Sequence, residues 1–333
     1  MTCRIAELTP CYRCRTVKIL VFGGTGFIGN RVLRKLVERG HEVAAFDINP
    51  SLPAYDRDFS QKVQVLRGDI TLMDDVVEAM LAVKPDHVLN LAYLMGGGDP
   101  HTGVRLNVLG MDNCFEAARL CGIKRVVYAS SLTVYGEQVN FGVRPVVEAD
   151  FRHGKGLYAA SKIYNEHQAE WYSAAYDMQI TGLRAAHVTG WDKVRGSTDH
   201  VKCITEPARG KPVEFPFRDA MRLPIHVSDV AEIFSRLVED DASRHPVYNS
   251  GGNGISMGDL AALVTRFVPD SQITFAQETG GRDASSIWLM DNSRWLDEYD
   301  YPLPAFEHRV LEMINEVRQD AGLPLIAGES VHA

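Results

Sequence analysis

A glycine-rich turn placed directly after a short apolar run is the feature that most constrains how this chain can fold. Residues 17–22, Val-Lys-Ile-Leu-Val-Phe, have the composition of a buried strand and lead into Gly23, Gly26 and Gly29. The apolar residues that follow recur at helical spacing, and Gly40 ends that run. In such a unit the backbone can approach a pyrophosphate closely, and the helix N-terminus offers it free N–H groups. The sequence therefore predicts a dinucleotide-binding unit.

An acidic residue at the end of the next predicted strand indicates which dinucleotide binds. Residues 42–46 form this strand, and Asp47 follows it, eighteen residues after Gly29. That is about the distance at which a dinucleotide site needs an acid. The carboxylate can accept hydrogen bonds from both ribose hydroxyls and would repel a 2′-phosphate, and no arginine follows it immediately. We therefore expect NAD rather than NADP.

Strand and helix signals alternate through the first half of the chain, which is typical of a parallel sheet with crossover helices. We therefore expect an α/β fold, with a Rossmann-type doubly wound parallel sheet and a smaller C-terminal substrate-binding domain. The further predicted strands are residues 63–66, 86–92, 125–129 and 247–249, and the predicted helices include 27–38, 74–83, 104–121 and 229–237. The glycine-rich loop 93–103 is either a flexible connector or a rim that moves when substrate binds.

A Tyr-x-x-x-Lys step, Tyr158 and Lys162, supplies candidate chemistry. The two side chains share one face of a predicted helix, where a cation beside a phenol would lower the phenol's pKa toward the range of a general base. Ser130 and Ser131 follow the strand 125–129, at the edge where open α/β sheets bind ligands. The sequence therefore predicts a hydride-transfer site at this edge.

The composition of the chain argues against several classes of binding partner. The chain has 333 residues, a formal net charge of −8 and no block of Lys and Arg, which argues against nucleic acid and acidic membranes. No apolar run approaches the roughly 20 residues of a membrane span, so we expect a cytoplasmic protein. Cys11 and Cys14 form a C-x-x-C pair, but we interpret residues 1–16 as a disordered extension with incidental thiols and predict no metal site.

The motifs, taken together and in this order, resemble the extended short-chain dehydrogenases/reductases, in the NAD-dependent epimerase/dehydratase branch. The resemblance covers residues 17 to about 300 and includes Arg184 and the run 225–231. It implies a cofactor site formed by Gly23, Gly26, Phe27, Ile28, Gly29, Asp47, Asp69, Ile70, Leu91, Ala92, Asn107 and Lys162. It also implies a homodimer.

The mechanism that the resemblance implies agrees with the chemistry expected from the Tyr-x-x-x-Lys motif and the serine pair. Tyr158 would take or give the hydroxyl proton, Lys162 would lower its pKa and bind the nicotinamide ribose, and Ser131 would bind the substrate oxygen. Dehydratases of the family carry an Asp-Glu pair where this chain has Leu132 and Thr133, so we exclude a 4,6-dehydratase. His226 and Asp229 match the family pattern, and we interpret them as organising the backbone and a helix start.

Two of the predicted substrate residues match the family pattern, whereas His187 and the segment 215–221 depart from it. Arg222 and Arg282 match positions where the family's nucleotide-sugar enzymes hold a diphosphate, for which the guanidinium fork is suited. His187 stands where those enzymes usually have an Asn that contacts phosphate, and it could replace the contact or remove it. The aromatic segment 215–221 replaces a Gly-Asp-Gly turn, which indicates either a more apolar substrate end or packing.

These observations lead to a domain division and three functional hypotheses. Residues 17–185 with about 225–252 would form the NAD-binding domain, and about 186–224 with 253–330 the substrate-binding domain. We expect an NAD-dependent epimerase of a sugar or nucleotide-linked sugar. The second hypothesis is a net dehydrogenase or reductase of a secondary alcohol or ketone, and the third is a non-catalytic NAD-binding regulator.

Overall fold

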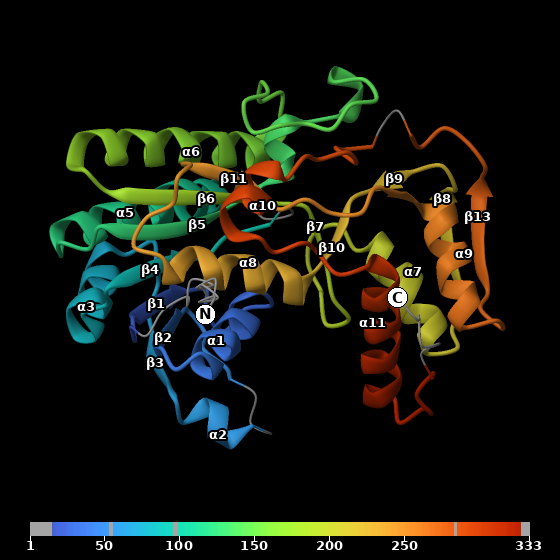
Figure 1. Ribbon diagram of the computed structural model, residues 1–333, viewed down its shortest axis with the longest axis horizontal. Coiled ribbons are helices and arrows are strands. Elements are labelled where there is room, and N and C mark those ends of the chain that lie inside the picture. The colour runs from blue at the N-terminus through green and yellow to red at the C-terminus, as the bar shows by residue number, and fades with distance from the viewer. Residues whose placement is uncertain (1–14, 53–55, 96–98, 283–284, 328–333) are drawn as a thin grey trace, which may run out of the picture.

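The computed structural model describes residues 15–52, 56–95, 99–282 and 285–327. Two layered parts lie side by side in it, a large one built on a central sheet and a small one at the other end of the molecule (Figure 1). Most of the predicted N-terminal extension, with Cys3, Cys11 and Cys14, lies outside the described residues, as do the three glycines at 96–98.

The central sheet has seven strands, all parallel, in the order β11-β6-β5-β4-β1-β2-β3. This order confirms the predicted doubly wound sheet. Because helices cover both faces, the inner strands are buried along nearly their whole length, as expected for a parallel sheet. Their bounds are Lys18–Phe22 (β1), Glu42–Asp47 (β2), Val63–Arg67 (β3), His87–Asn90 (β4), Arg125–Ser131 (β5), Gln179–Ala185 (β6) and Val247–Asn249 (β11).

Helices pack on both faces of this sheet. On one face, α1 (Gly29–Glu38) and α8 (Val227–Glu239) share a core with the strands. On the other, α3 (Met73–Val83), α5 (Gly110–Leu120) and α6 (Gly156–Tyr176) enclose a second core. Short helical segments in the connections are α2 (Arg57–Ser60), α4 (Pro100–Val104), η2 (Leu132–Tyr135) and η3 (Gln138–Asn140).

Two predicted helices differ in detail from the structure. The predicted helix 104–121 is interrupted by a π-helical turn, η1 (Arg105–Leu109), before α5 begins. The prediction missed it because a π turn changes the backbone without disturbing the apolar spacing, and such turns often lie at functional sites. At the start of α8 the N-cap is His226, whose Nδ1 accepts from the Ser228 N–H, whereas Asp229 lies in the first turn.

The small part has its own core between α7 (Asp199–Ala208), α9 (Met257–Phe267) and α11 (Phe306–Asp320). Its short strands are β8 (Val213–Phe217) paired with β13 (Ile273–Gln277), and β9 (Met221–Arg222) paired with β12 (Ile255–Ser256). The pair β7 (His187–Thr189) and β10 (Pro224–His226) lies between the two parts (Figure 1).

One segment that the sequence assigned to the substrate domain packs elsewhere. The helix α10 (Ser293–Tyr299) lies against β11, and Trp295 and Tyr299 are buried in the core of the large part. Their rings stack with centroids 4.3 Å apart. Because this apolar surface belongs to the core of the sheet, we propose that residues 287–303 belong with the NAD-binding domain.

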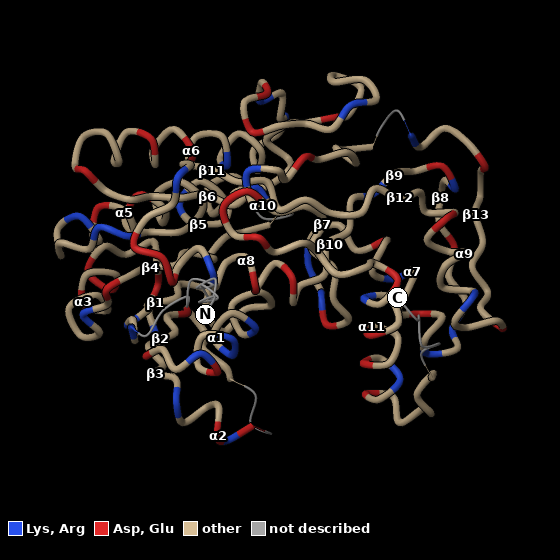
Figure 2. Tube along the Cα trace, viewed as in Figure 1, with Lys and Arg blue, Asp and Glu red and all other residues tan. Residues whose placement is uncertain are grey.

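Ion pairs link helices across the molecule. Charged residues lie along both α1 and α8 (Figure 2). Arg39, at the end of α1, binds Glu232 of α8 at 2.6 Å, and Lys35 lies 3.2 Å from the same carboxylate. Arg309 of α11 binds the buried Asp229 of α8. Asp229 thus holds the small part against the large one, which extends its predicted structural role. Within the described residues, no helix is both long enough and apolar enough to cross a membrane.

Glu316 of α11 generates a prediction about stability. Burial raises the pKa of Glu316 to about 7, with Glu312 adding repulsion, while Arg31 lowers it. A carboxyl whose folded-state pKa is raised stabilises the fold below its unfolded pKa, and this stability is lost as pH rises through about 7. Glu316→Gln should remove that loss. Chemical denaturation between pH 4.5, the usual pKa of such a carboxyl, and about pH 7 should show a flatter dependence of the unfolding free energy on pH for the variant. Identical slopes for variant and wild type would contradict the assignment.

Candidate active site

The glycine loop folds tightly because three backbone segments meet there. Gly23 has a φ of +70°, and a Cβ on it would lie 2.7 Å from the backbone nitrogen of Ala92, at the end of β4. A Cβ on Gly29 would lie 2.3 Å from the Gly23 carbonyl oxygen. No side chain caps the N-terminus of α1, and its first turn contains no acidic residue. This cradle therefore suits the negative charge of a pyrophosphate.

Asp47 lies beside this loop at the carboxyl end of β2. Its Oδ2 accepts a hydrogen bond from the Thr25 hydroxyl at 2.9 Å, and the side chain is half-buried. The Thr25 contact fixes the carboxylate next to the phosphate cradle and leaves its other oxygen available for a ribose. The positions of the glycine loop and Asp47 therefore fit the pyrophosphate and a ribose of NAD.

The other predicted cofactor residues line the same edge of the sheet or support it. Asp69 follows β3, and Ile70 is buried with its carbonyl bound to Asn113 at 2.9 Å. Leu91 and Ala92 follow β4 directly. Asn107, in the π turn, exchanges two hydrogen bonds with the backbone of Leu94, at 2.8 and 3.0 Å. The side chain of Asn107 thus fixes the loop after β4, so any contact with cofactor would come through this loop.

The three predicted catalytic residues come together from β5 and α6. Ser131 ends β5, where its Oγ accepts from the Thr133 N–H at 3.2 Å. Tyr158 lies on the first turn of α6, close enough to Ser131 for hydrogen bonding with that side chain to lower the pKa of the phenol. Lys162 lies one turn further along and donates from Nζ to the Ala129 carbonyl of β5 at 2.6 Å. One strand end and one helix face therefore position the whole group.

The electrostatics of this group differ from the sequence-based expectation. The Lys162 ammonium lies 3.1 Å from the ring centroid of Tyr93 and 5.7 Å from that of Tyr158. Burial raises the pKa of Tyr158, whereas its hydrogen bond with Ser131 lowers that pKa. Burial also holds the pKa of Lys162 well below its usual range. In this arrangement desolvation dominates, so the pKa of Tyr158 is raised and not lowered as expected.

Tyr93 is a residue of this group that sequence reasoning missed. Its ring packs edge-on against Tyr158 at a centroid distance of 5.5 Å, and its hydroxyl accepts from Asn165 at 3.3 Å. Asn165 also donates to the carbonyl of Asn107 at 2.9 Å, which connects α6 to the π turn. No spacing rule indicated Tyr93, because it lies in an irregular loop.

A buried ion pair holds α6 in place behind the catalytic group. Glu166 accepts two hydrogen bonds from Arg184 of β6, both at 2.8 Å, and one from Ser130 of β5 at 2.6 Å. Burial opposes ionisation of Glu166, yet the hydrogen bonds from Arg184 hold its pKa below its usual range. Glu166 lies one helical turn beyond Lys162, so a Tyr, Lys and Glu at four-residue spacing was a signal that the sequence analysis did not use.

On the substrate side, both predicted arginines lie around Met221. Arg222 donates to the Met221 carbonyl at 2.7 Å, and a guanidinium nitrogen of Arg282 lies 3.8 Å from the Met221 sulfur. Arg222 is also ion-paired with Asp199, which the sequence analysis did not single out. Both ring nitrogens of His187 have partners, the Leu223 N–H at 2.9 Å and the Ser286 hydroxyl at 3.0 Å. His187 therefore has a structural role in addition to any contact with substrate.

Comparison with known proteins decides the family. Residues 19–251 match the model of the NAD dependent epimerase/dehydratase family. The chain belongs to this family. It is 30% identical over 241 residues to the protein CapI of Staphylococcus aureus, covering 68% of this chain and 71% of that protein.

Epimerases and dehydrogenases both occur among the relatives. The crystal structure of UDP-glucose 4-epimerase from Thermus thermophilus, a complex with NAD, superposes with a TM-score of 0.78 at 26% identity, covering 90% of this chain and 99% of that one. A 3-beta-hydroxysteroid dehydrogenase of Mycolicibacterium neoaurum is 36% identical over 132 residues, which cover 38% of this chain and 35% of that enzyme. The chain is therefore an NAD-dependent enzyme of the extended short-chain dehydrogenase/reductase family.

Replacing Asp47 tests the cofactor assignment. Asp47→Asn should narrow the preference for NADH over NADPH in a fluorescence binding titration, because the repulsion of a 2′-phosphate is removed. Asp69→Asn is the matched control, since it removes a carboxylate from the same sheet edge and should leave the ratio unchanged. An unchanged ratio in Asp47→Asn would contradict the assigned role.

Replacing Glu166 tests the buried support. Glu166→Gln leaves Arg184 buried without its counter-charge, which should reduce the free energy of unfolding by about 3–5 kcal/mol. Glu170→Gln, one turn further along α6 and exposed, should change it by less than about 1 kcal/mol. Urea denaturation measures both values, and equal effects would refute the special role of Glu166.

Proposed function

We propose that this protein is an NAD-dependent sugar epimerase that works by transient hydride transfer at a secondary alcohol carbon. The observation that carries the proposal is the grouping of Ser131, Tyr158 and Lys162 beside the glycine loop, at one edge of one sheet. The similarity to a UDP-glucose 4-epimerase over nearly the whole chain supports the epimerase outcome.

Each residue of the group has a distinct task in this proposal. Tyr158 takes the proton of the substrate hydroxyl and later returns it, because its phenol is an acid/base that interacts with Ser131. Ser131 orients the reacting oxygen through its hydroxyl. Lys162 would bind the nicotinamide ribose from the side of the helix, and Tyr93 and the Ala129 carbonyl hold its side chain there. When bound, NAD supplies the acceptor and donor of hydride.

A net dehydrogenase or reductase is the second candidate. The ion pair between Asp199 and Arg222 favours it, because an arginine expected to hold a diphosphate is engaged within the chain. The similarity to a steroid dehydrogenase over 132 residues supports the same hypothesis. The two candidates share every residue of the hydride-transfer site and differ in whether the cofactor is regenerated.

We also propose that the protein forms a homodimer through α6 and its neighbours. Three aromatic residues of α6 are exposed, with Trp171 at 76%, Tyr164 at 51% and Tyr176 at 47%. Exposed aromatic side chains on one helix are enriched at protein interfaces, which supports this face as the contact.

The net change in NADH during turnover distinguishes the proposed epimerase from a dehydrogenase. Incubation of the purified protein with candidate sugars should convert them without net change in NADH, because an epimerase reoxidises the cofactor it reduces. Stoichiometric accumulation of NADH with product would establish the net dehydrogenase instead. Retention of NAD through purification is the accompanying measurement expected for an enzyme that recycles it.

Removing the phenol hydroxyl tests the chemistry itself. Tyr158→Phe should lower kcat by roughly 10²–10⁴-fold, since general acid–base catalysis contributes about that much, and should leave NAD binding nearly unchanged. Tyr164→Phe, on the same helix but exposed, is the control and should retain full turnover. Undiminished turnover in Tyr158→Phe would overturn the assignment.

A further inference from the structure

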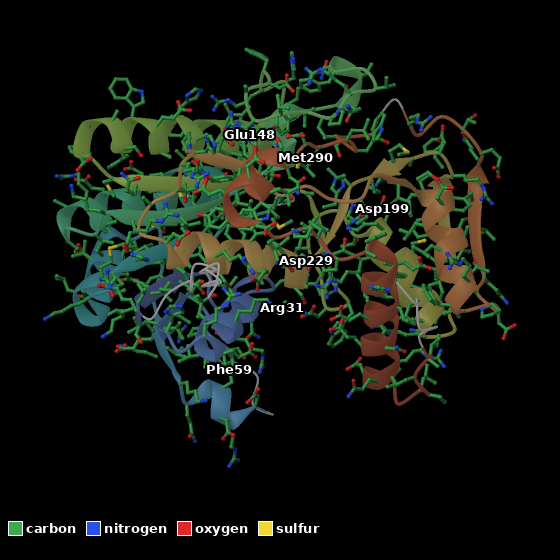
Figure 3. The ribbon with its side chains drawn as sticks, viewed as in Figure 1. Arg31, Phe59, Glu148, Asp199, Asp229 and Met290 are labelled. Atoms are coloured by element: carbon green, nitrogen blue, oxygen red, sulfur yellow. The ribbon has the colours of Figure 1, made fainter. Side chains whose placement is uncertain are left out.

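We propose that Asp199 determines the substrate class by neutralising Arg222, so that the site takes an uncharged compound rather than a nucleotide-linked one. This inference rests on the proposed function, because it assigns the substrate of the same hydride-transfer site. Figure 3 shows Asp199 in the region of the small part that lies nearest to β7 and β10.

All three nitrogens of the Arg222 guanidinium have a partner within the chain. Nε donates to Oδ2 of Asp199 at 2.9 Å, Nη2 contacts the same oxygen, and Nη1 donates to the Met221 carbonyl at 2.7 Å. A diphosphate would have to displace the carboxylate before it could bind the guanidinium as a fork. The arginine that family resemblance assigns to phosphate is thus already engaged.

The Asp199 side chain is held in its charged form. Burial opposes ionisation, but hydrogen bonds from His200 and Arg222 outweigh it and keep the pKa of Asp199 well below its usual range. Oδ1 accepts from the backbone N–H of His200 at 2.8 Å, which fixes the carboxylate at the start of α7. An approaching phosphate therefore meets an anion as well as a cation, and the net attraction is cancelled.

Asp199 and Arg222 form one wall of a cavity of about 160 Å³, whose volume and other walls indicate what it can hold. An apolar cavity of about 150 Å³ accommodates one benzene ring, whereas sites for larger ligands measure roughly 300–1,000 Å³. The cavity itself can therefore hold a group of about one ring, and a nucleoside diphosphate would not fit inside it. The remaining side chains of the wall are mainly apolar: Phe215, Pro216, Phe217, Ala220 and Met257.

The cavity is connected to the catalytic edge of the sheet through one short segment. Ser286 pairs with Glu137, two residues beyond Tyr135 at the end of η2, and its hydroxyl lies 3.0 Å from His187. The adjacent Ser285 lines the cavity, and its Oγ accepts from the Met221 N–H at 2.9 Å. The cavity is therefore lined by the neighbour of a residue that pairs with the segment following η2.

Calorimetric titration of the NAD-saturated protein with UDP tests this inference, since UDP carries the diphosphate and base without the sugar. We expect the wild type to bind UDP at least about tenfold more weakly than Asp199→Asn, in which Arg222 is released. The gain should disappear in the double variant Asp199→Asn/Arg222→Gln, because the released guanidinium is what binds the phosphate.

Two results would overturn the inference. One is a wild-type Kd for UDP of about 10 μM or tighter, and the other is an Asp199→Asn variant with no gain in affinity. Asp199→Ser repeats the test with a smaller side chain, and the thermal unfolding midpoint of each variant confirms that it is folded.

The titration does not require turnover, so its outcome is separable from that of the proposed function. If Tyr158→Phe remained active while Asp199→Asn gained affinity for UDP, the function would fail and this inference would stand. If Tyr158→Phe lost activity and UDP bound tightly to the wild type, the reverse would hold.

Discussion

The buried ion pair between Glu166 and Arg184 is the interaction on which the rest of the site depends. It joins α6 to β6, and the hydrogen bond from Ser130 extends it to β5. Because a carboxylate and a guanidinium at this depth must satisfy each other, the helix has one favourable position relative to the sheet. That position sets Tyr158 and Lys162 against the end of β5, where Ser131 lies.

The cofactor half of the site was predictable because it depends on local sequence. The glycine loop follows its strand directly, Asp47 ends the neighbouring strand, and parallel strands bring their carboxyl ends to one edge. Spacing along the chain therefore translates into position in space. The exception is the π turn at Asn107, which apolar periodicity cannot distinguish from a regular helix.

The substrate half was not predictable from spacing, because its decisive contacts join residues far apart in the chain. Asp199 of α7 meets Arg222 of β9 from 23 residues away, and Ser286 reaches His187 from 99 residues away. The placement of Trp295 in the core of the large part depends likewise on a tertiary contact. A motif match assigned Arg222 to phosphate, but the carboxylate that engages it in the structure has no sequence signature.

We propose Tyr158 as the acid/base of a hydride-transfer site that NAD completes, and the pKa of the Tyr158 phenol tests this role most directly. Burial alone raises that pKa, so a base at neutral pH requires a further positive charge beside the phenol. NMR titration of isotope-labelled tyrosine, with Tyr158→Phe identifying the resonance, measures it with and without NAD⁺. We expect the pKa of Tyr158 to be lower when NAD⁺ is bound than in its absence. A pKa that stays raised in both states would contradict it.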